Sequence, residues 1–496
     1  MVDEYYNLHT EQIHPYKQGD PHRLNTDNYY TQHITPHDIK QTIKTLKNNT
    51  PGETKINKTI LQHLPEVALE CYTKLLNISL SMGYFPRPFK HAKLILLPKP
   101  GKNTTDPINY RPISLLEVPG KIYEKIINKR TRTYLETNNI LPNTQHGFRP
   151  ARSTDTATAI LAEVLGKTLT DKKQCCLALR DVSKAFDKVW QKGLKYKINN
   201  TDMPSLLKKL LCSSLDNRTA AIFIHSYTGP PFQLLSRVPQ GSSISPTLYT
   251  LYTHDTPTPI TDSTHIIYAD DITQIITYAG KSKNMFAKTI EKEIKNINTF
   301  EHKWKIKTNT QKFTLLPIAS RNLKPVNING NNIPYATEAK VLGLTHGRSG
   351  YAKHVHEITR KAQIAINTMR RFQTLNNNIK LHLVKACVLP ILTYPAYTLN
   401  ALSKTQLNKL QKKQNIALRF AFDIRHPYSH TTEELHTLAN ITPINITLFN
   451  RGSKTLHTLT HNTFNNIIQE YEHNKDHSWF KKPISTLTRE PPDPIY

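Results

Sequence analysis

The strongest constraint on the fold is a pair of acidic elements, each attached to a short apolar run. Asp181 follows the apolar run 175–179 within a predicted strand at 175–182, and Asp270-Asp271 separates the two strands of a predicted hairpin at 264–277. The second pattern is typical of a β-hairpin with the aspartates at its turn. Aspartate often occupies turns for local hydrogen bonding alone, but a surface turn does not require a hydrophobic strand on each side. We therefore expect buried strands that bring three carboxylates together.

The charge balance indicates a polyanionic partner. Lys and Arg total 66 against 37 Asp and Glu, and the formal net charge is +29. Such an excess fits either nucleic acid or an acidic membrane surface, and its size favours nucleic acid. Carboxylates concentrated in so basic a chain indicate a divalent-metal site that acts on phosphate. Two metal ions roughly 3.5–4 Å apart are the arrangement that drives in-line phosphoryl displacement.

The cysteines and the N-terminal sequence exclude several classes of protein. The five cysteines show neither CxxC nor Cys/His spacing, so the sequence predicts no disulfide framework and no zinc site. The first residues do not resemble a signal peptide, and no apolar stretch approaches the length of a membrane span. We therefore expect a protein of the nucleus or cytoplasm that is neither secreted nor inserted in a membrane.

The chain divides by composition into four predicted segments. Residues 1–34 form a polar N-terminal lead, and residues 35–345 alternate predicted strands and helices. Residues 346–476 are basic and nearly all helical in pattern, and residues 477–496 are predicted to be a disordered tail. A chain of 496 residues is expected to contain more than one core. Strands that alternate with helices predict a layered α/β or α+β domain.

Local patterns predict individual elements in the first half. Thr35 as N-cap and Pro36 at the first helical position predict a helix that reaches Lys47. Apolar residues at helical spacing predict helices at 58–82 and 120–137. A strand is predicted at 93–97. In the helix at 120–137 four basic residues are expected to point outward, namely Lys125, Lys129, Arg130 and Arg132.

The start of one helix is predicted within the basic helical region 346–476. Ser403 and Gln406 resemble a capping box, followed by an apolar face that includes Leu410 and Leu418. Lysines such as Lys409 and Lys412 fall outside that face. They form either an ordinary solvated surface or a surface that follows a phosphate backbone, and the net charge favours the second.

A series of short segments then occurs in a fixed order along the chain. Their positions are 93–102, 109–116, 145–149, 181–187, 238–246, 268–271, 304 with 309–312, and 341–344. In this order they resemble the reverse transcriptase of non-LTR (LINE-type) retrotransposons, most closely the jockey-like group. The resemblance covers roughly residues 35–460.

The resemblance implies a right-hand polymerase of the α+β class. Residues 35–345 would form the fingers and a palm with an antiparallel sheet, and residues 346–476 a helical thumb with a basic nucleic-acid-binding region. The implied enzyme is an RNA-directed DNA polymerase, a nucleotidyltransferase that extends a DNA 3′ end on an RNA template with dNTP substrates. The family's full-length polyproteins carry an endonuclease domain ahead of the polymerase, and residues 1–35 offer no room for one. The sequence carries no prediction of an oligomeric state.

The resemblance also assigns roles to individual residues. Asp181, Asp270 and Asp271 match the catalytic carboxylates that hold two Mg²⁺ ions, with Mn²⁺ as a substitute. The residues that match the family's primer-binding positions are Tyr268, Leu342 and Gly343. The residues that match its nucleotide-binding positions are Lys99, Arg111, Phe186, Gln240, Gly241 and Lys312.

Each nucleotide-binding position has an expected task. Lys99 and Arg111 would neutralise triphosphate charge. Phe186 would exclude a 2′-hydroxyl, Gln240-Gly241 would lie beside template and nucleotide, and Lys312 would act as general acid toward pyrophosphate. The structural alternatives are surface cations, core packing for Phe186 and a turn that needs a glycine.

Two departures from the family pattern support an alternative function. Arg180 stands where the family has an apolar residue. Its side chain is expected either to bury a charge, which is costly unless the charge is paired, or to reach outward to solvent. The segment 345–348 replaces acidic and aromatic residues of the primer-binding hairpin. These departures favour a decayed or truncated copy that acts as a nucleic-acid-binding protein. A third hypothesis, an RNA-templated RNA polymerase, is disfavoured by Phe186.

Overall fold

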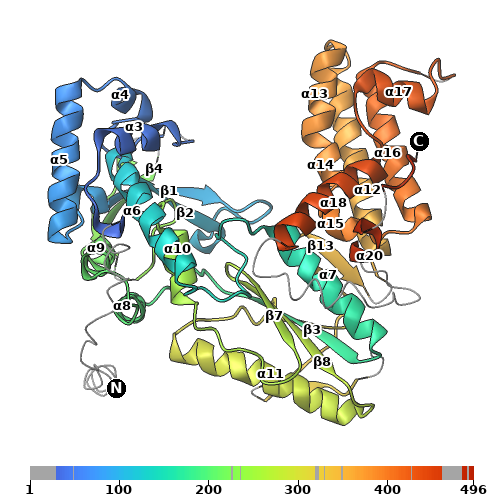
Figure 1. Ribbon diagram of the computed structural model, residues 1–496, viewed down its shortest axis with the longest axis horizontal. Coiled ribbons are helices and arrows are strands. Elements are labelled where there is room, and N and C mark those ends of the chain that lie inside the picture. Colours follow the sequence, from blue (N-terminus) through green and yellow to red (C-terminus); the bar gives the residue numbers. More distant parts are fainter. Residues whose placement is uncertain are drawn as a thin grey trace. The chain divides into compact units, whose positions relative to one another are not determined.

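The computed structural model describes residues 29–47, 50–224, 227–234, 236–318, 323–328, 330–347, 350–425, 427–460, 483–488 and 491–495 (Figure 1). The chain forms two compact units. The first contains residues 1–138 and 194–245, and the second contains residues 139–193 and 246–496. Helices combine with sheets whose strand pairs are mostly antiparallel, which confirms the predicted α+β class.

The first helix described in this unit begins at the cap that the sequence predicts. The N-cap Thr35 and Asp38 form a capping box at the start of α3 (Pro36–Lys44), as predicted. The predicted helix at 58–82 is two helices, α4 (Lys58–Gln62) and α5 (Glu66–Met82), because Pro65 interrupts it. The unit also contains α9 (Ser205–Leu215), and α8 (Gln191–Asn199) crosses the boundary between the units.

A five-stranded sheet completes the first unit. At one edge β2 (Tyr110–Leu116) pairs antiparallel with β1 (His91–Pro98), and β1 also pairs in parallel with β4 (Thr219–Ile224). Two short strands, β5 (Tyr227–Thr228) and β6 (Phe232–Gln233), pair with β4. The 3-10 turns η2 (Arg87–Lys90) and η3 (Pro107–Asn109) lead into β1 and β2.

The prediction that four basic residues of the helix at 120–137 point outward is wrong for one of them. In α6 (Val118–Thr137) the side chain of Arg130 is buried, and its Nη1 donates to the carbonyl of Tyr30 at 3.4 Å. Tyr30 also packs edge-on against Tyr134 of the same helix. The helical pattern alone could not show that residues near position 30 would cover this side of α6.

The second unit is built on a four-stranded antiparallel sheet. Its order is β7 (Thr264–Tyr268), β8 (Asp271–Tyr278), β3 (Gln174–Asp181) and β9 (Thr314–Pro317). The predicted strand at 175–182 and the predicted hairpin at 264–277 are therefore confirmed. Both faces of the sheet are covered by helices (Figure 1).

Alternate residues of each strand enter different cores. Cys175 and Leu177 face α7 (Thr154–Thr170), whereas Cys176 and Ala178 face α11 (Lys283–Lys303). This alternation follows from the two-residue period of a strand. Further elements of the unit are α10 (Ser245–Tyr252), the hairpin β10 (Val326–Ile328) with β11 (Asn331–Ile333), and the hairpin β12 (Glu338–Val341) with β13 (Leu344–Gly347).

The C-terminal region is helical, as predicted. It contains α12 (Ala352–Met369), η4 (Arg370–Phe372), α13 (Asn377–Cys387), α14 (Leu389–Leu392), α15 (Ala396–Leu399), α16 (Lys404–Ala421), α17 (Thr432–Ala439) and α18 (Ile444–Thr460). The capping box of Ser403 and Gln406 starts α16. Apolar residues of these helices share one core with α7 and with one face of the palm-like sheet β7–β8–β3–β9.

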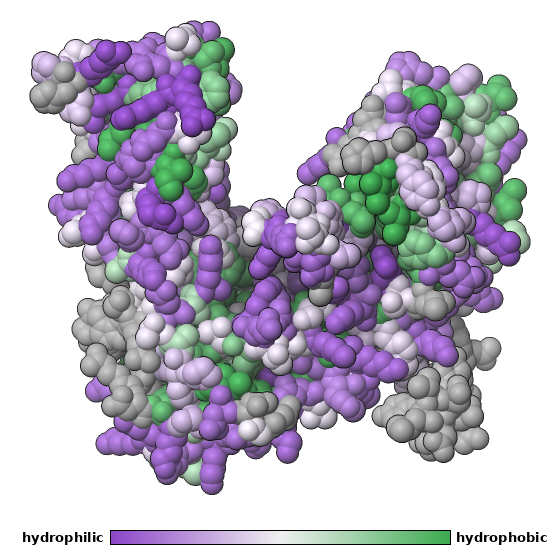
Figure 2. Space-filling model, turned by 180° about the vertical axis from the view of Figure 1, so that it is seen from behind, coloured by the Kyte–Doolittle hydropathy of each residue, from purple (hydrophilic) through white to green (hydrophobic). Residues whose placement is uncertain are grey.

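Part of the segment predicted to be a disordered tail is ordered. The short helix α20 (Pro483–Leu487) buries Ile484 and Leu487 in the same core, and the amide of Ile484 donates to Glu163 Oε1 at 2.9 Å. Residues 477–482 lie outside the described residues. Within the part of the chain that the structure describes, no helix is long and apolar enough to cross a bilayer. The face shown in Figure 2 is mostly hydrophilic.

Arg180 is buried on the α11 face of the sheet. Its Nε donates to Gln274 Oε1 at 3.1 Å, its Nη1 to Asn298 Oδ1 at 2.8 Å and its Nη2 to the carbonyl of Ile294 at 2.9 Å. Nη1 also lies 3.3 Å from a carboxylate oxygen of Glu301, which is itself buried. Of the two alternatives for Arg180, the structure therefore shows the buried charge, and the charge is paired rather than directed to solvent.

We predict that Arg180→Met lowers the free energy of unfolding by about 3–5 kcal/mol, because it leaves Glu301 buried without its partner. Urea denaturation of the full chain measures this change. Lys353→Met breaks an ion pair with Glu338 that is about half exposed, and it should cost no more than about 1 kcal/mol. A loss below 1 kcal/mol for Arg180→Met would contradict the prediction.

Candidate active site

The register of β3 and β8 sets two carboxylates opposite one another. Asp181 at the end of β3 pairs directly with Asp271 at the start of β8. Both lie on the α7 face of the sheet, the face opposite to Arg180. Asp270 lies in the two-residue turn between β7 and β8, because Tyr268 pairs with Asp271. Directly opposed residues have Cβ atoms roughly 4.5–5.5 Å apart, so like charges there repel.

The pKa values of Asp270 and Asp271 reflect burial and the nearby carboxylates. Partial burial, and then the neighbouring carboxylates of Asp270 and Asp181, raise the pKa of Asp271 to about 6, although the residue retains an exposed surface. Burial also raises the pKa of Asp270, with Asp181 adding to the rise. A cluster of carboxylates that resists full ionisation is the electrostatic setting that a bound cation relieves.

Lys312 occupies the open side of Asp181. Its Nζ lies 2.9 Å from Asp181 Oδ2, and the Lys312 side chain is 62% exposed. The loop that carries Lys312 is fixed to the end of β3, because the amide of Asn309 donates to the carbonyl of Asp181 at 2.8 Å. An ion pair this exposed contributes no more than about 1 kcal/mol, so a competing cation can displace the lysine at little cost.

The three aspartates fit a hard divalent cation. Carboxylate oxygens are the donors that Mg²⁺ and Mn²⁺ prefer, and two of the three side chains are held opposite each other by sheet register. Among the described residues, however, no group of three or more His, Cys, Asp and Glu side chains is arranged so that it could hold a metal ion.

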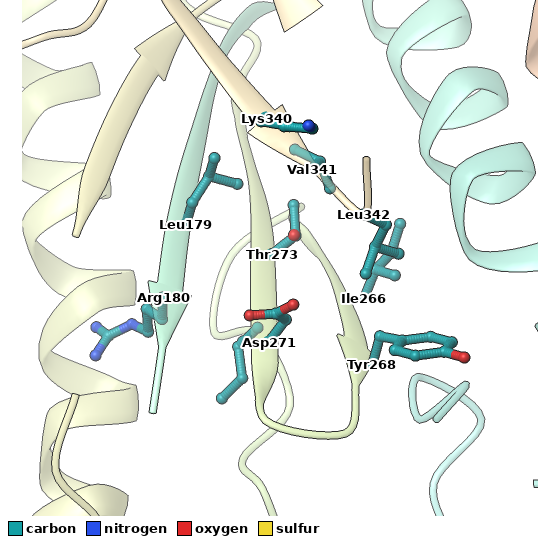
Figure 3. A pocket seen from close by; sticks show the side chains of 10 residues that line it. Leu179, Arg180, Ile266, Tyr268, Asp271, Thr273, Lys340, Val341 and Leu342 are labelled. Atoms are coloured by element: carbon teal, nitrogen blue, oxygen red, sulfur yellow. The ribbon is translucent and has the colours of Figure 1, made fainter. Parts of the chain in front are cut away.

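A small cavity of about 60 Å³ adjoins the carboxylates on the same face of the sheet. Asp271, Thr273 and Tyr268 contribute from the palm-like sheet, and Val341 and Leu342 contribute from the end of β12 (Figure 3). Figure 3 also shows Arg180 directed away from Asp271, toward the helix on the opposite face. The cavity therefore brings two predicted primer-binding residues, Tyr268 and Leu342, next to the predicted catalytic Asp271.

The hairpin that carries Leu342 is held by the helical region. Leu342 and Gly343 form its turn with φ angles of 47° and 89°, in the left-handed region. The hydroxyl of Tyr394 donates to the carbonyl of Leu342 at 2.5 Å, and a Cβ on Gly343 would lie only 3.0 Å from the Tyr394 ring. Both the turn geometry and this close ring favour glycine at position 343.

Phe186 lies in an aromatic cluster rather than alone. Its ring stacks on Tyr249 of α10 at 5.2 Å between centroids and meets the edge of Phe148 at 6.0 Å. Phe186 is half-buried, Tyr249 is buried, and Phe148 is 42% exposed. Aromatic contacts of this kind fix a ring in one orientation.

The remaining nucleotide-binding candidates belong to the first unit. Lys99 and Arg111 lie at one end of the β1–β2 hairpin, since the amide of Lys99 donates to Asn109 and Arg111 pairs with Leu97. Gln240 and Gly241 lie against β2: the Gln240 carbonyl accepts from the amide of Ser114 at 2.8 Å. A Cβ on Gly241, which has a φ of +120°, would lie 2.4 Å from the Ser114 carbonyl.

The structure therefore assembles part of the predicted site. It brings together seven candidates of the second unit, namely Asp181, Asp270, Asp271, Lys312, Tyr268, Leu342 and Gly343, whereas Phe186 contacts Tyr249 and Phe148. The convergence of Lys99, Arg111, Gln240 and Gly241 with these residues stays a prediction. Tyr249 and Tyr394 carry no signal in the sequence, and Phe148 has no role assigned within the segment 145–149, because each acts through contacts between segments that are distant in the chain.

Comparison with known proteins tests the family resemblance independently of the structure. The family model described as reverse transcriptase (RNA-dependent DNA polymerase) matches residues 97–346. The RNA-directed DNA polymerase from mobile element jockey of Drosophila melanogaster is 30% identical over 403 residues, covering 78% of this chain and 43% of the relative. The probable RNA-directed DNA polymerase from transposon X-element of the same organism is 32% identical over 353 residues, covering 69% of this chain and 38% of the relative. The chain thus spans less than half the length of these relatives.

Among solved structures, apo telomerase from Candida tropicalis aligns with a TM-score of 0.38 and 11% identity, over 82% of this chain and 73% of that chain. A form of it truncated from the C-terminal domain aligns with a TM-score of 0.36 and 13% identity, over 59% of each chain.

We predict that Asp271→Asn stabilises the metal-free protein at pH 7.5. The pKa of Asp271 is raised to about 6 from 3.8, so the folded state binds more protons than the unfolded state between these values. Stability therefore falls as pH rises through this window, and the repulsion is fully present above it. The gain should be at most about 1 kcal/mol, because solvent screens the partly exposed charge.

Thermal denaturation in a metal chelator at pH 7.5 and at pH 4 measures the effect, which should be largest at the higher pH. Asp202→Asn removes an equivalent charge from an exposed position and should give no gain, because the chain is already strongly basic. A lower melting temperature for Asp271→Asn at pH 7.5 would be the opposite of this expectation.

Proposed function

The chain belongs to the reverse transcriptase (RNA-dependent DNA polymerase) family, and from that membership we propose that it extends a DNA 3′ end on an RNA template. It would do so with dNTP substrates, as the RNA-directed DNA polymerase of a non-LTR retrotransposon. The observation that supports this most is the carboxylate cluster, in which Asp181 opposes Asp271 and Asp270 occupies the adjoining turn. The similarity to three transposon-encoded polymerases from Drosophila melanogaster supports the same reading.

We infer that the three carboxylates hold two Mg²⁺ ions, or Mn²⁺ ions in their place. When bound, the ions activate the primer 3′-hydroxyl and neutralise the charge of the triphosphate and the departing pyrophosphate. Asp181 and Asp270 are the principal ligands in this proposal, and Asp271 is the third. The raised pKa of Asp271 supports it, because the carboxylates repel until a cation is present.

Lys312 is proposed as the general acid toward pyrophosphate. Its contact with Asp181 places a cation at the edge of the carboxylate cluster, and its exposed side chain is free to turn toward a phosphate once Asp181 binds metal. Lys99 and Arg111, both at one end of the β1–β2 hairpin, are proposed to neutralise the triphosphate. Gln240 and Gly241 are proposed to lie beside template and nucleotide.

Phe186 is proposed to select deoxynucleotides. A ring wedged between Tyr249 and Phe148 cannot swing aside, so it would meet a 2′-hydroxyl directly. Simple core packing is the competing role for Phe186. Its half-exposed position between a buried and an exposed aromatic favours contact with a substrate.

The primer and the duplex would be held by the rest of the second unit. Tyr268, Leu342 and Gly343 are proposed to position the primer end, since they adjoin the Asp271 side of the sheet. Residues 35–345 are proposed as fingers and palm and residues 346–476 as thumb and nucleic-acid-binding region. Exposed Lys409 and Lys412 on α16 suit contact with phosphates. We place the enzyme in the nucleus or cytoplasm.

The alternative is a nucleic-acid-binding protein without catalysis. Arg180 does not support it, because the guanidinium is paired with Glu301 and with three hydrogen-bond acceptors. The altered residues after Gly343 do not support it either: Thr345 and His346 are buried, and the hairpin is formed.

We predict that the full chain incorporates dNTPs on a primed RNA template in the presence of Mg²⁺, and that Asp270→Asn reduces incorporation to background because a metal ligand is lost. Primer extension on RNA and DNA templates measures this, with Asp202→Asn as a control that should retain activity. Salt-dependent RNA binding without incorporation by the folded wild-type chain would instead establish the alternative.

We predict that Phe186→Ala lowers the preference for dNTP over rNTP by roughly tenfold or more, because the ring that excludes the 2′-hydroxyl is gone. Single-nucleotide incorporation with dGTP and GTP measures the ratio. Phe313→Ala removes a partly buried ring on the opposite face of the sheet, beside Arg180, and should leave the ratio unchanged. Equal ratios in wild type and Phe186→Ala would assign Phe186 to core packing.

A further inference from the structure

Residues 144–147 lie along β7, the edge strand that leads to the turn carrying Asp270. The amide of Ile267 in β7 donates to the carbonyl of Thr144 at 2.8 Å, and the amide of His146 donates to the carbonyl of Ile267 at 2.7 Å. Gln145 thereby forms a parallel bridge with Ile267. The segment 144–147 therefore continues the sheet beyond β7 and ends beside the turn that carries Asp270.

The side chain of Gln145 binds that turn directly. Its Oε1 accepts from the amide of Ala269 at 3.0 Å and from the amide of Gly147 at 2.8 Å. Gln145 is only 2% exposed, so water cannot replace it as an acceptor without a rearrangement. Ala269 immediately precedes Asp270, and its amide is therefore fixed one residue from a proposed metal ligand.

The backbone of the segment also presses against the turn. A Cβ built on Gly147 would lie 2.2 Å from the amide nitrogen of Ala269 and 2.9 Å from its Cα. Only glycine allows so close an approach between the two chains. The turn consequently cannot shift toward residue 147, and the Gln145 hydrogen bond keeps it from moving away.

This turn needs support from outside itself. Ala269 has a φ of 58°, in the left-handed region, which costs a residue with a Cβ roughly 1–2 kcal/mol. The carboxylates of Asp270 and Asp271 follow immediately, and their repulsion adds to the tendency to open. Strained conformations of this kind persist only where their surroundings determine them.

The bracing segment is itself fixed. Arg149 Nη1 donates to the carbonyl of Pro142 at 2.7 Å, and Arg152 Nη1 donates to the carbonyl of Gln145 at 3.2 Å. His146 Nδ1 lies 3.1 Å from Thr156 Oγ1 of α7. The segment is thus tied to α7, one of the main core helices, and provides a rigid support for the turn.

We propose that Gln145 is a positioning residue for the turn that carries Asp270: its side-chain oxygen holds the Ala269 amide, and so fixes the backbone position of Asp270 in the absence of metal. The catalytic consequence rests on the proposed polymerase activity, whereas the effect on metal affinity rests only on the proposed metal site. Preorganisation of this type is what supporting residues supply to metal sites, and their loss typically weakens metal binding by roughly 10–100-fold.

The test uses Gln145→Met, which keeps the size of the side chain and removes the acceptor. Mn²⁺ binding to the full chain without nucleic acid, measured by electron paramagnetic resonance, should weaken by about tenfold or more. Hydrogen exchange of a peptide that contains Ala269 should accelerate in the same variant. The Mg²⁺ concentration that gives half-maximal primer extension should rise in parallel.

A matched control separates this effect from general destabilisation. Gln411 is equally buried, and its Oε1 also accepts a backbone amide, that of Ile444, at 2.7 Å, within the C-terminal helices. Gln411→Met should reduce stability and leave the Mn²⁺ affinity unchanged. Adding Ala269→Gly to Gln145→Met should restore part of the Mn²⁺ affinity, because glycine adopts the left-handed conformation without strain. A purely structural role of Gln145 predicts no such rescue.

The outcomes distinguish this inference from the proposed function. Weaker Mn²⁺ binding by Gln145→Met together with no primer extension by any variant supports the inference and rejects the polymerase. Wild-type Mn²⁺ affinity in a folded Gln145→Met protein overturns the inference, as does the absence of Mn²⁺ binding by wild type. If Gln145→Met does not fold, Gln145→Asn, whose amide is too short to reach Ala269, is measured against the same two criteria.

Discussion

The pairing of β3 with β8 is the interaction on which the rest of the structure depends. It joins two segments far apart in the chain and sets Asp181 opposite Asp271. Placed alone, these carboxylates would separate, since like charges directly opposed across a sheet repel. They stay together because the same strands carry Leu177 and Ile275 into a large apolar core. Hydrophobic burial therefore maintains an electrostatically unfavourable arrangement at the end of the strands.

Successive residues of a strand point to opposite faces of the sheet, so Asp181 and Arg180 lie in different environments. Asp181 lies on one face, opposite Asp271, which lines the cavity beside Tyr268 and Leu342. Arg180, one residue earlier, enters the opposite core and is neutralised by Glu301. The Arg180 charge, although adjacent in sequence to Asp181, is thus part of the buried packing on the opposite face of the sheet. The side chain that most suggested decay of the enzyme is instead accommodated by its own set of partners.

Support for the site comes from segments that are not adjacent in sequence. Gln145 holds the turn before Asp270, Tyr394 holds the turn at Leu342, and Tyr249 stacks on Phe186. Each of these residues contacts a proposed functional residue without being one of the predicted ligands. The turn before Asp270, the turn at Leu342 and the ring of Phe186 are consequently each held by a separate long-range contact, and groups held in place before a ligand binds need no reorganisation when it does.

Much of this could be predicted where the determining forces are local. The capping box of Thr35 with Asp38 and that of Ser403 with Gln406 depend on residues three apart, and both were predictable. The hairpin at the aspartates was predictable because apolar runs flank a turn. The burial of Arg130, the helix at 483–487 and the role of Gln145 were not. Each depends on a partner that the chain supplies from a distant segment.

The sequence by itself determined the strands that carry the aspartates, the two capping boxes, the family and the identity of the three carboxylates. Each of these depends on neighbouring residues or on an ordered series of motifs. Only the tertiary structure decided that Asp181 faces Asp271, that Arg180 is neutralised beneath them and that Gln145 braces their turn. Strand register and long-range hydrogen bonds depend on which distant segments pack together, and no local pattern records that choice.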